Sequence, residues 1–254
     1  NPLGGPAKQR LDRLLVERGL AETLDQAIGL IGGGRVQVDG RPCDKAGCPV
    51  GVGAAITVRP GRRYVSRGGE KLEAGLLALQ VDPDGCVCAD IGCSTGGFTD
   101  CLLQHGATRV YSVDVGYGLL DWKLRQDPRV VVLERTNARH LSAAHIPEPI
   151  DLAVIDASFI SLALLFPPLL PLFRSAVRIL ALVKPQFQLP REKIGRGGIV
   201  SDAALHDEAL AMVRGFGDAH QLTCAGVTAS PVRGAKGNQE FLMLLTGPSP
   251  VKQQ

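Results

Sequence analysis

Apolar residues recur with a helical spacing near the start of the chain. Leu11, Leu14 and Leu15 fall on one face of a helix, with arginines around that face, which predicts an amphipathic helix. Thr23 and Gln26 have the spacing of a capping box, in which side chains satisfy free backbone N–H groups of the first turn. We therefore expect a second short helix to begin at this point.

After the glycines at 32–34 the pattern changes to an alternation of apolar and polar residues. Residues 35–41 (RVQVDGR) alternate into an Asp-Gly pair, a strong hairpin signal because these residue types tolerate positive φ. Residues 56–58 (ITV) are expected to form a closing strand. The first 60 residues thus predict a small α+β unit of two helices and a hairpin.

From residue 87 onward, short apolar runs alternate with helical stretches. This alternation is typical of a mostly parallel sheet with helices on both faces, so the predicted fold class of this part is α/β. The last two runs bracket a Gly-rich turn and are expected to form a hairpin on the sheet edge. The expected strands are residues 87–91, 110–113, 130–133, 152–155, 179–183, 225–229 and 241–245.

Charge is distributed unevenly between the two parts. Residues 1–71 hold twelve Lys and Arg against seven Asp and Glu, whereas the rest of the chain holds sixteen against eighteen. A basic N-terminal part followed by a mildly acidic remainder indicates that one domain recruits a polyanion. We expect a small domain at residues 8–61, a basic linker at 62–71 and a larger domain at 72–247.

The sharpest local motif is the glycine-containing segment 90–100 (DIGCSTGGFTD), placed between an expected strand and an expected helix. Glycines at this position let backbone N–H groups approach a ligand at the helix N-terminus. The segment does not fit the dinucleotide pattern G-x-G-x-x-G, and instead resembles the first motif of S-adenosylmethionine (SAM) binding. Asp114 ends the next strand, where a carboxylate can accept both ribose hydroxyls of a nucleotide. A tight turn without a ligand is the alternative interpretation.

Charged residues also follow three other apolar runs. Asp156 ends one (LAVID), Lys184 ends the next (LALVK), and Glu240 opens the last (EFLML). Because ligands of such sheets bind outside the carboxyl ends of the parallel strands, Asp156 and Lys184 are expected to point into one cleft. Each residue could equally form a salt bridge at the sheet edge, and Lys71 alone would be interpreted as a solvated charge.

The chain resembles the TlyA (haemolysin A) family of ribosomal RNA 2′-O-methyltransferases over nearly its whole length. The matching segments are an S-four-type RNA-binding domain (RLDRLLVERGLAETLDQAIGLI, then GRVQVDG), the linker YVSRGGEKL, and the motifs DIGCSTGGFTD, VDVGYG, DASFISL, LVKPQFQ and GNQEFL. The resemblance implies a Rossmann-like, FtsJ-type methyltransferase domain with an antiparallel last strand. It further implies SAM as cofactor and cytidine 2′-hydroxyls of ribosomal RNA in the ribosomal subunits as substrate.

By this resemblance, the family's Lys–Asp–Lys–Glu tetrad falls on Lys71, Asp156, Lys184 and Glu240. Deprotonating a ribose 2′-hydroxyl requires a base, and a lysine serves only where burial or a nearby cation lowers its pKa. Lys184 is the predicted base and Lys71 the nearby cation, with the two carboxylates orienting them. The predicted SAM-binding residues are Asp90, Gly92, Cys93, Ser94, Thr95, Gly96, Gly97, Phe98 and Asp114, with Asn137 and Arg139 near the adenine.

RNA contacts are expected mainly on the small domain. The predicted phosphate-binding residues are Arg10, Arg13, Arg18, Arg35 and Arg41, with Arg67 in the linker. Phosphate contacts of this kind supply affinity and salt sensitivity rather than sequence preference. Residues 186–198 (QFQLPREKIGRGG) follow Lys184 and are interpreted equally well as a mobile flap over RNA or as a long loop.

The remaining features bear on compartment and on rival functions. Seven cysteines, an odd number without C-x-x-C pairs, favour reduced thiols in the cytoplasm and argue against zinc. The N-terminal residues show no secretion signal, and the apolar run at 157–173 is too short and too rich in proline to span a membrane. A membrane-active haemolysin, an RNA-binding protein without activity and a pseudouridine synthase remain as alternatives. The sequence does not predict the oligomeric state.

Overall fold

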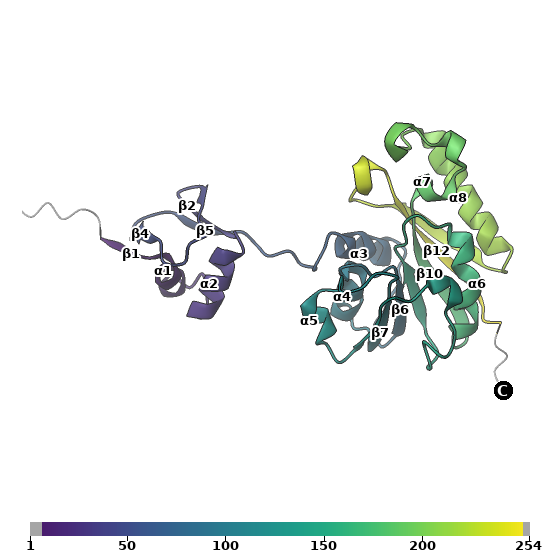
Figure 1. Ribbon diagram of the computed structural model, residues 1–254, viewed down its shortest axis with the longest axis horizontal. Coiled ribbons are helices and arrows are strands. Elements are labelled where there is room, and N and C mark those ends of the chain that lie inside the picture. Colours follow the sequence, from purple (N-terminus) through teal and green to yellow (C-terminus); the bar gives the residue numbers. More distant parts are fainter. Residues whose placement is uncertain (1–6, 251–254) are drawn as a thin grey trace, which may run out of the picture. The chain divides into compact units, whose positions relative to one another are not determined.

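The computed structural model describes residues 7–250 of the chain and separates into two compact units, residues 1–62 and residues 63–254 (Figure 1). Residues 1–6 and 251–254 lie outside the described part. The first of these segments belongs to the N-terminal region in which no secretion signal was expected. Each unit has its own hydrophobic core and is described by itself.

Unit 1 is a small α+β unit, as the sequence predicted. Thr23 caps the second helix by accepting a hydrogen bond from the backbone N–H of Gln26 at 3.1 Å. The Asp39–Gly40 turn joins two antiparallel strands, and both of its residues have positive φ. The elements are β1 (Lys8–Arg10), α1 (Leu11–Glu17), α2 (Leu24–Gly32), β2 (Val36–Val38), β3 (Arg41–Pro42), β4 (Pro49–Gly51) and β5 (Ile56–Val58).

Apolar residues of both helices form the core of unit 1. Leu11 and Leu15 of α1 and Ile31 of α2 are fully buried together with Val36 of β2. The strands β1 and β4 pair as a separate two-stranded sheet that the sequence did not predict, because three residues rich in charge carry no apolar alternation.

Unit 2 is built on a seven-stranded sheet with the order β11-β12-β10-β9-β6-β7-β8. Five strands are parallel, whereas β12 is antiparallel to both of its neighbours, as the resemblance implied. The strands β11 and β12 form the expected hairpin, with β11 on the edge. The strands are β6 (Val87–Ile91), β7 (Arg109–Val113), β8 (Val130–Leu133), β9 (Leu152–Ile155), β10 (Ala176–Val183), β11 (Thr223–Ala229) and β12 (Phe241–Pro248).

Helices cover both faces of this sheet, as expected for the α/β class (Figure 1). One hydrophobic cluster joins the sheet to α3, α4 and α5, and another joins its opposite face to α6 and α8. The helix α3 begins at Gly68, so the last residues of the predicted linker are helical. The helices are α3 (Gly68–Ala78), α4 (Gly97–Gln104), α5 (Trp122–Arg125), α6 (Phe166–Leu169), α7 (Pro185–Gln188) and α8 (Ala203–Asp218).

This topology brings the carboxyl ends of β6, β7, β9 and β10 to one edge of the sheet. The residues directly after these strands are Gly92, Asp114, Asp156 and Lys184. Within residues 7–250, no helix combines the length and the apolar character needed to span a bilayer.

Candidate active site

The glycine loop after β6 is shaped by two positions with positive φ. Gly92 has φ +81°, and its Cα lies against the backbone carbonyl of Asp156, so a Cβ at this position would collide with it. Gly96 has φ +99° and precedes the first residue of α4. The N–H groups of Gly92 and Cys93 donate to the carbonyl of Val113 in the neighbouring strand at 2.8 and 3.1 Å. The loop is thereby fixed at the end of the sheet.

Asp114 ties the glycine loop to the end of β7. Its Oδ2 accepts a hydrogen bond from the N–H of Ser94, and its Oδ1 accepts one from the N–H of Gly116, both at 2.8 Å. A carboxylate has about four acceptor positions, so two of them stay available to a ligand. Asp114 therefore shapes the loop and can still accept ribose hydroxyls.

A cavity of about 650 Å³ opens beside this loop, within the range of roughly 300–1,000 Å³ that is usual for small-molecule sites. The predicted SAM residues that line it are Gly92, Ser94, Asp114, Asn137 and Arg139. Asn137 caps the turn after β8 by accepting a hydrogen bond from the N–H of Arg139 at 3.0 Å. The cavity size, the glycine cradle and the strand-end carboxylate fit an adenosine-type cofactor such as SAM.

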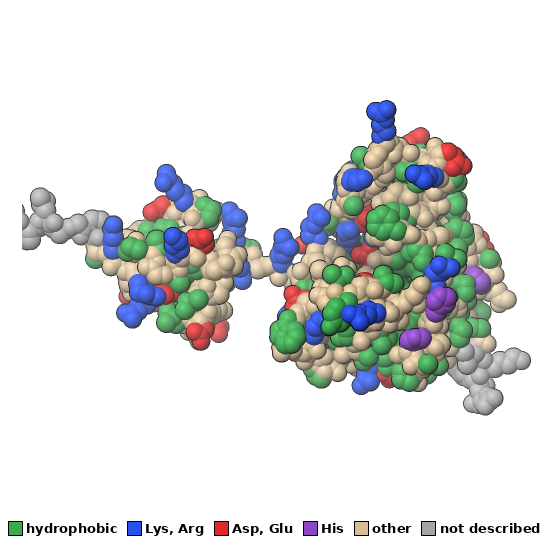
Figure 2. All heavy atoms as spheres, viewed as in Figure 1, with side chains coloured by type: hydrophobic (Ala, Val, Ile, Leu, Met, Phe, Trp, Pro, Cys, Tyr) green, Lys and Arg blue, Asp and Glu red, His purple; other side chains and the backbone are tan. Residues whose placement is uncertain are grey.

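A second cavity, of about 220 Å³, lies between the glycine loop and the segment that precedes α3. Its walls include Arg67 and Lys71 on one side, Asp156, and the predicted SAM residues Gly92, Cys93, Ser94, Thr95, Gly97 and Phe98. Both cavities share Gly92, Ser94 and Asp156, so they meet at the ends of β6 and β9. Figure 2 shows a hollowed face of unit 2 with Lys and Arg side chains around the hollow.

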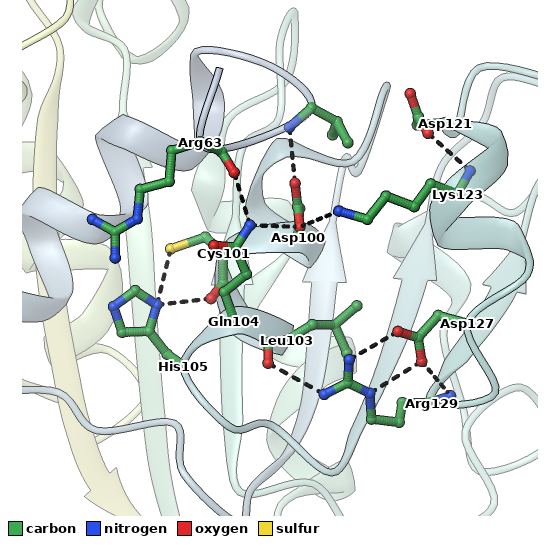
Figure 3. Close-up of polar contacts among 11 residues, drawn as sticks. Arg63, Asp100, Cys101, Leu103, Gln104, His105, Asp121, Lys123, Asp127 and Arg129 are labelled. Atoms are coloured by element: carbon green, nitrogen blue, oxygen red, sulfur yellow. Dashed lines mark hydrogen bonds and ion pairs between the residues drawn. The ribbon is translucent and has the colours of Figure 1, made fainter. Parts of the chain in front are cut away.

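Polar contacts hold the segment before α3 against α4. The N–H of Val65 donates to Asp100 Oδ2 at 2.8 Å. The side-chain amide of Gln104 donates to the carbonyl of Arg63 at 2.8 Å and to Asp100 Oδ1 at 3.0 Å (Figure 3). The backbone of Gly97 packs so closely on Ser66 and Gly69 that a Cβ at Gly97 would collide with both. These contacts set the position from which Lys71 reaches the cavity.

The four residues of the predicted tetrad form two ion pairs. Lys184 Nζ lies 2.6 Å from Asp156 Oδ1 and donates to Ser158 Oγ at 2.9 Å. Lys71 Nζ donates to Glu240 Oε2 at 2.6 Å. Lys184 is only 8% exposed and Glu240 only 2%. Because a buried charge is tolerated only when it is paired, each lysine and its carboxylate depend on one another.

Asp90 lies behind the glycine loop rather than in it. It is completely buried, and its Oδ2 accepts a hydrogen bond from Thr99 Oγ1 at 2.7 Å. Its Oδ1 has no hydrogen-bond partner within residues 7–250. Burial raises the pKa of Asp90 to about 7, which the Thr99 hydrogen bond partly opposes and the nearby Asp156 and Asp114 carboxylates support. Asp90 and Gly96 are the two predicted SAM residues that line neither cavity.

The segment 186–198 is held by contacts at several points. Lys193 Nζ pairs with the Glu208 carboxylate of α8 at 2.6 Å. Asn238 donates to the carbonyl of Gly198 and accepts from the N–H of Val200, both at 2.9 Å. Leu189 and Val200 also pack on α8 in a small hydrophobic cluster. These contacts attach the loop to α8 and to the turn before β12.

Comparison with known proteins identifies both units. The model of the FtsJ-like methyltransferase family matches residues 64–246, and the model of the S4 domain matches residues 9–56. The chain is 47% identical to "Putative rRNA methyltransferase YqxC" of Bacillus subtilis (strain 168), with 95% of this chain and 86% of that protein covered. It is 45% identical to "16S/23S rRNA (cytidine-2'-O)-methyltransferase TlyA" of Mycobacterium tuberculosis, with 94% and 90% covered.

A solved structure agrees with these matches. "Putative hemolysin from Streptococcus thermophilus" shares 40% identity and a TM-score of 0.72, with 96% of this chain and 90% of that chain covered. The chain belongs to the TlyA family of FtsJ-like methyltransferases. Its second unit is the methyltransferase domain, whose family uses SAM as the methyl donor.

The S4 domain holds the predicted RNA-binding arginines in two different ways. Arg10 pairs with buried Asp12 at 2.5 Å, Arg18 donates to the carbonyls of Val52 and Ala54, and Arg35 donates to that of Arg59. Arg13 and Arg41 are exposed, and in the part of the chain that the structure describes their side chains form no hydrogen bond or ion pair. These two arginines are consequently the most available to a polyanion, whereas Arg18 and Arg35 also stabilise their own domain.

The methyltransferase domain also contains site residues that the sequence reasoning did not single out. Ser158 contacts Lys184 directly, Phe159 is 89% exposed with φ +63°, and Gln186 is buried two positions after Lys184. The motifs DASF and VKPQF contain all three, so their proximity to Asp156 and Lys184 was the available signal. What the sequence could not supply was which of these side chains lack a partner.

Proposed function

We propose that this protein transfers the methyl group of SAM to the ribose 2′-hydroxyl of a cytidine in ribosomal RNA. The observation that supports this best is the arrangement of two buried lysine–carboxylate ion pairs, Lys184–Asp156 and Lys71–Glu240, beside the cavities. The relative from M. tuberculosis carries this activity in its name and is similar to this chain over both units. The S4 domain is consistent with an RNA substrate.

The larger cavity suits the cofactor in this proposal. Asp114 would hold the ribose hydroxyls, Asn137 and Arg139 would border the adenine, and the loop from Gly92 to Phe98 would hold the remainder. Bound SAM supplies a methyl group on a positively charged sulfur, which an oxygen nucleophile can attack. The residues of the chain must then position that oxygen and remove its proton.

Lys184 is the proposed base. Nζ has three positions beyond its bond to the side chain; one donates to Ser158 Oγ, and a second side of the group lies against the Asp156 carboxylate. The third position can therefore face the 2′-hydroxyl. In the proposed step the hydroxyl proton would pass to the lone pair of the neutral Lys184 amine as the O–CH₃ bond forms and the S–CH₃ bond of SAM breaks, and the resulting ammonium would be paired with Asp156. Asp156 and Ser158 fix the direction of Nζ, which restricts transfer to an oxygen on one side of the group.

Lys71 is the proposed positioning cation for the hydroxyl. It lines the smaller cavity together with Asp156, so both ion pairs border the same space. Glu240 holds Lys71, and its carboxylate packs directly on the Cα of Gly234, where a Cβ would collide with it. This packing leaves the Glu240 carboxylate no room to move toward Gly234. Because Glu240 accepts the hydrogen bond of Lys71, the position of the carboxylate also sets the direction of the Lys71 ammonium group.

We further propose that the S4 domain recruits ribosomal subunits in the cytoplasm through its exposed cations, with Arg67 contributing at the entrance of the smaller cavity. Arg67 is exposed and lines that cavity. Phosphate contacts of this kind give affinity that decreases with salt.

The test is a map of 2′-O-methylated positions in ribosomal RNA from cells with and without the gene. At least one cytidine should lose its methyl group in the deletion strain and regain it when the purified full chain is added with SAM. Assaying isolated subunits beside naked RNA identifies the partner. RNA binding without any SAM-dependent methylation would support the alternative of an RNA-binding protein without activity.

A further inference from the structure

A third cavity, of about 430 Å³, lies next to the proposed reaction centre. It shares Phe159 with the SAM-sized cavity. Its other walls come from α7 and the loop after it, and from the turn before β12. Gln186 and Phe187 line it from α7, directly after Lys184 and Pro185. None of the roles proposed above uses this space.

Gln186 is the unusual residue in its wall. Its side chain is only 8% exposed, and Oε1 has no hydrogen-bond partner within residues 7–250. Leaving a buried amide oxygen unpaired destabilises a folded protein, so such groups are rare. Because Gln186 also lines the third cavity, a ligand that enters this cavity can supply the missing partner.

Two neighbouring buried amides are satisfied, which makes Gln186 the exception. Asn238 lines the same cavity, but both of its side-chain groups bind the backbone of Gly198 and Val200. Gln188 accepts a hydrogen bond from the N–H of Leu162 at 3.1 Å. The fold can therefore satisfy buried amides in this region, and the lack of a partner at Gln186 is specific to that position.

The rest of the cavity wall suits a nucleotide. Phe159 and Phe187 place their rings 4.8 Å apart, and they form an apolar wall for a flat heterocycle. Phe159 has φ +63° although it is not a glycine. This backbone conformation is strained, and such residues cluster at functional sites. Arg191 and Lys236 also line the cavity and bring positive charge for a neighbouring phosphate.

We propose that this cavity receives the base of the nucleotide that is methylated, and that Gln186 hydrogen-bonds to the base edge. This inference rests on the proposed function. A side-chain amide offers one acceptor and two donors, so Oε1 can accept from the 4-amino group of cytosine while Nε2 donates to ring N3. Gln186 follows Lys184 by two positions, so one nucleoside can present its 2′-hydroxyl to Lys184 and its base to Gln186.

The test compares variants at Gln186 on two templates. The wild-type chain is first used to locate its methylated cytidine, and subunits are then prepared with cytidine or uridine at that position. Gln186→Leu should methylate the cytidine template roughly 5- to 150-fold more slowly, the effect of losing a base-edge hydrogen-bond pair, and should no longer prefer cytidine over uridine. Gln186→Glu should also be slower on the cytidine template, because a carboxylate cannot donate to ring N3 and repels its lone pair.

Binding of SAM and thermal stability separate this role from a structural one. SAM affinity of Gln186→Leu, measured by calorimetry, should equal that of the wild type, and its Tm should be unchanged or higher because an unpaired buried oxygen is removed. The matched variant Asn238→Leu should lower Tm, since it removes two hydrogen bonds in the same wall.

Three results would overturn the inference. If both Gln186 variants methylated both templates as fast as the wild type, the inference would be overturned and the proposed function would stand. A fall in the Tm of Gln186→Leu as large as that of Asn238→Leu would indicate a structural role. A wild-type chain that methylates no cytidine in the first step would overturn the proposed function together with this inference.

Discussion

The two units of this molecule hold their positive charge in opposite ways. On the S4 domain, Arg13 and Arg41 are exposed and unpaired in the part of the chain that the structure describes. In the methyltransferase domain, Lys71 and Lys184 are nearly buried, and each is paired with a carboxylate. Exposed cations supply diffuse, salt-dependent attraction, whereas buried pairs fix a charge at a defined point. The uneven net charge of the sequence therefore agrees with the proposed recruiting surface on the S4 domain and gives no indication of the two buried ion pairs.

The largest expected effect comes from removing the proposed base. Lys184→Ala should lower kcat by roughly 10²- to 10⁴-fold, the usual contribution of general acid–base catalysis. Binding of SAM, followed by calorimetry, should change little because Lys184 does not line the SAM-sized cavity. Arg41→Ala on the S4 domain serves as the contrast, since an exposed cation should affect RNA affinity rather than kcat. Turnover of Lys184→Ala within a few-fold of wild type would contradict the assignment.

Breaking the other buried ion pair should mainly affect stability. Glu240→Gln leaves the Lys71 ammonium without its partner, and loss of one member of a buried pair lowers the free energy of unfolding by roughly 3–5 kcal/mol. The control is Glu208→Gln, which breaks the exposed Lys193–Glu208 pair and should change that free energy by at most about 1 kcal/mol. Urea unfolding of both variants measures the difference. If both substitutions lowered the free energy of unfolding by the same amount, the difference in burial between the two ion pairs would not affect their contribution to stability.

The sequence predicted the sheet better than the loops, for a physical reason. The strands β6, β8 and β9 have the bounds expected from their apolar runs, because strands of a sheet covered by helices on both faces are rich in apolar residues. The short strand β1 was missed, since Lys8–Arg10 is held by backbone pairing with β4 rather than by apolar contacts. The loop 186–198 could not be decided, because the Asn238 contacts that hold it join residues about 40 positions apart.

The residues of the candidate site also differ in how well the sequence predicted them. Strand-end positions indicated Asp156 and Lys184 directly, because topology brings the ends of parallel strands together. Lys71 carried no local signal and was singled out only by resemblance to the family. Gln186 was not singled out as a functional residue at all, because whether a side-chain amide finds a partner depends on long-range packing. Asp90 fits the motif, but its side chain is turned into the core.

Asp90 should make the stability of the methyltransferase domain depend on pH. Burial raises the pKa of Asp90 to about 7, against about 3.9 for an unfolded aspartate. Between these values only the folded state holds the proton, so the free energy of unfolding should fall by about 1.4 kcal/mol per pH unit as pH rises, and should level off above pH 7. Asp90→Asn removes this contribution. Urea unfolding from pH 5 to 8 should show the wild type losing stability relative to the variant, and parallel curves would contradict the prediction.

The smallest expected effect lies on the recruiting surface. Replacing Arg13 and Arg41 together by alanine should weaken binding to ribosomal RNA and reduce the slope of log affinity against log salt by about one per arginine, if each contacts a phosphate. Arg18→Ala should behave differently: Arg18 donates to the carbonyls of Val52 and Ala54, so its loss should lower the Tm of the S4 domain as well. Filter binding over a salt series, with thermal unfolding of each variant, makes the comparison. An unchanged salt slope in the double variant would mean that the exposed arginines of this unit do not carry the recruitment.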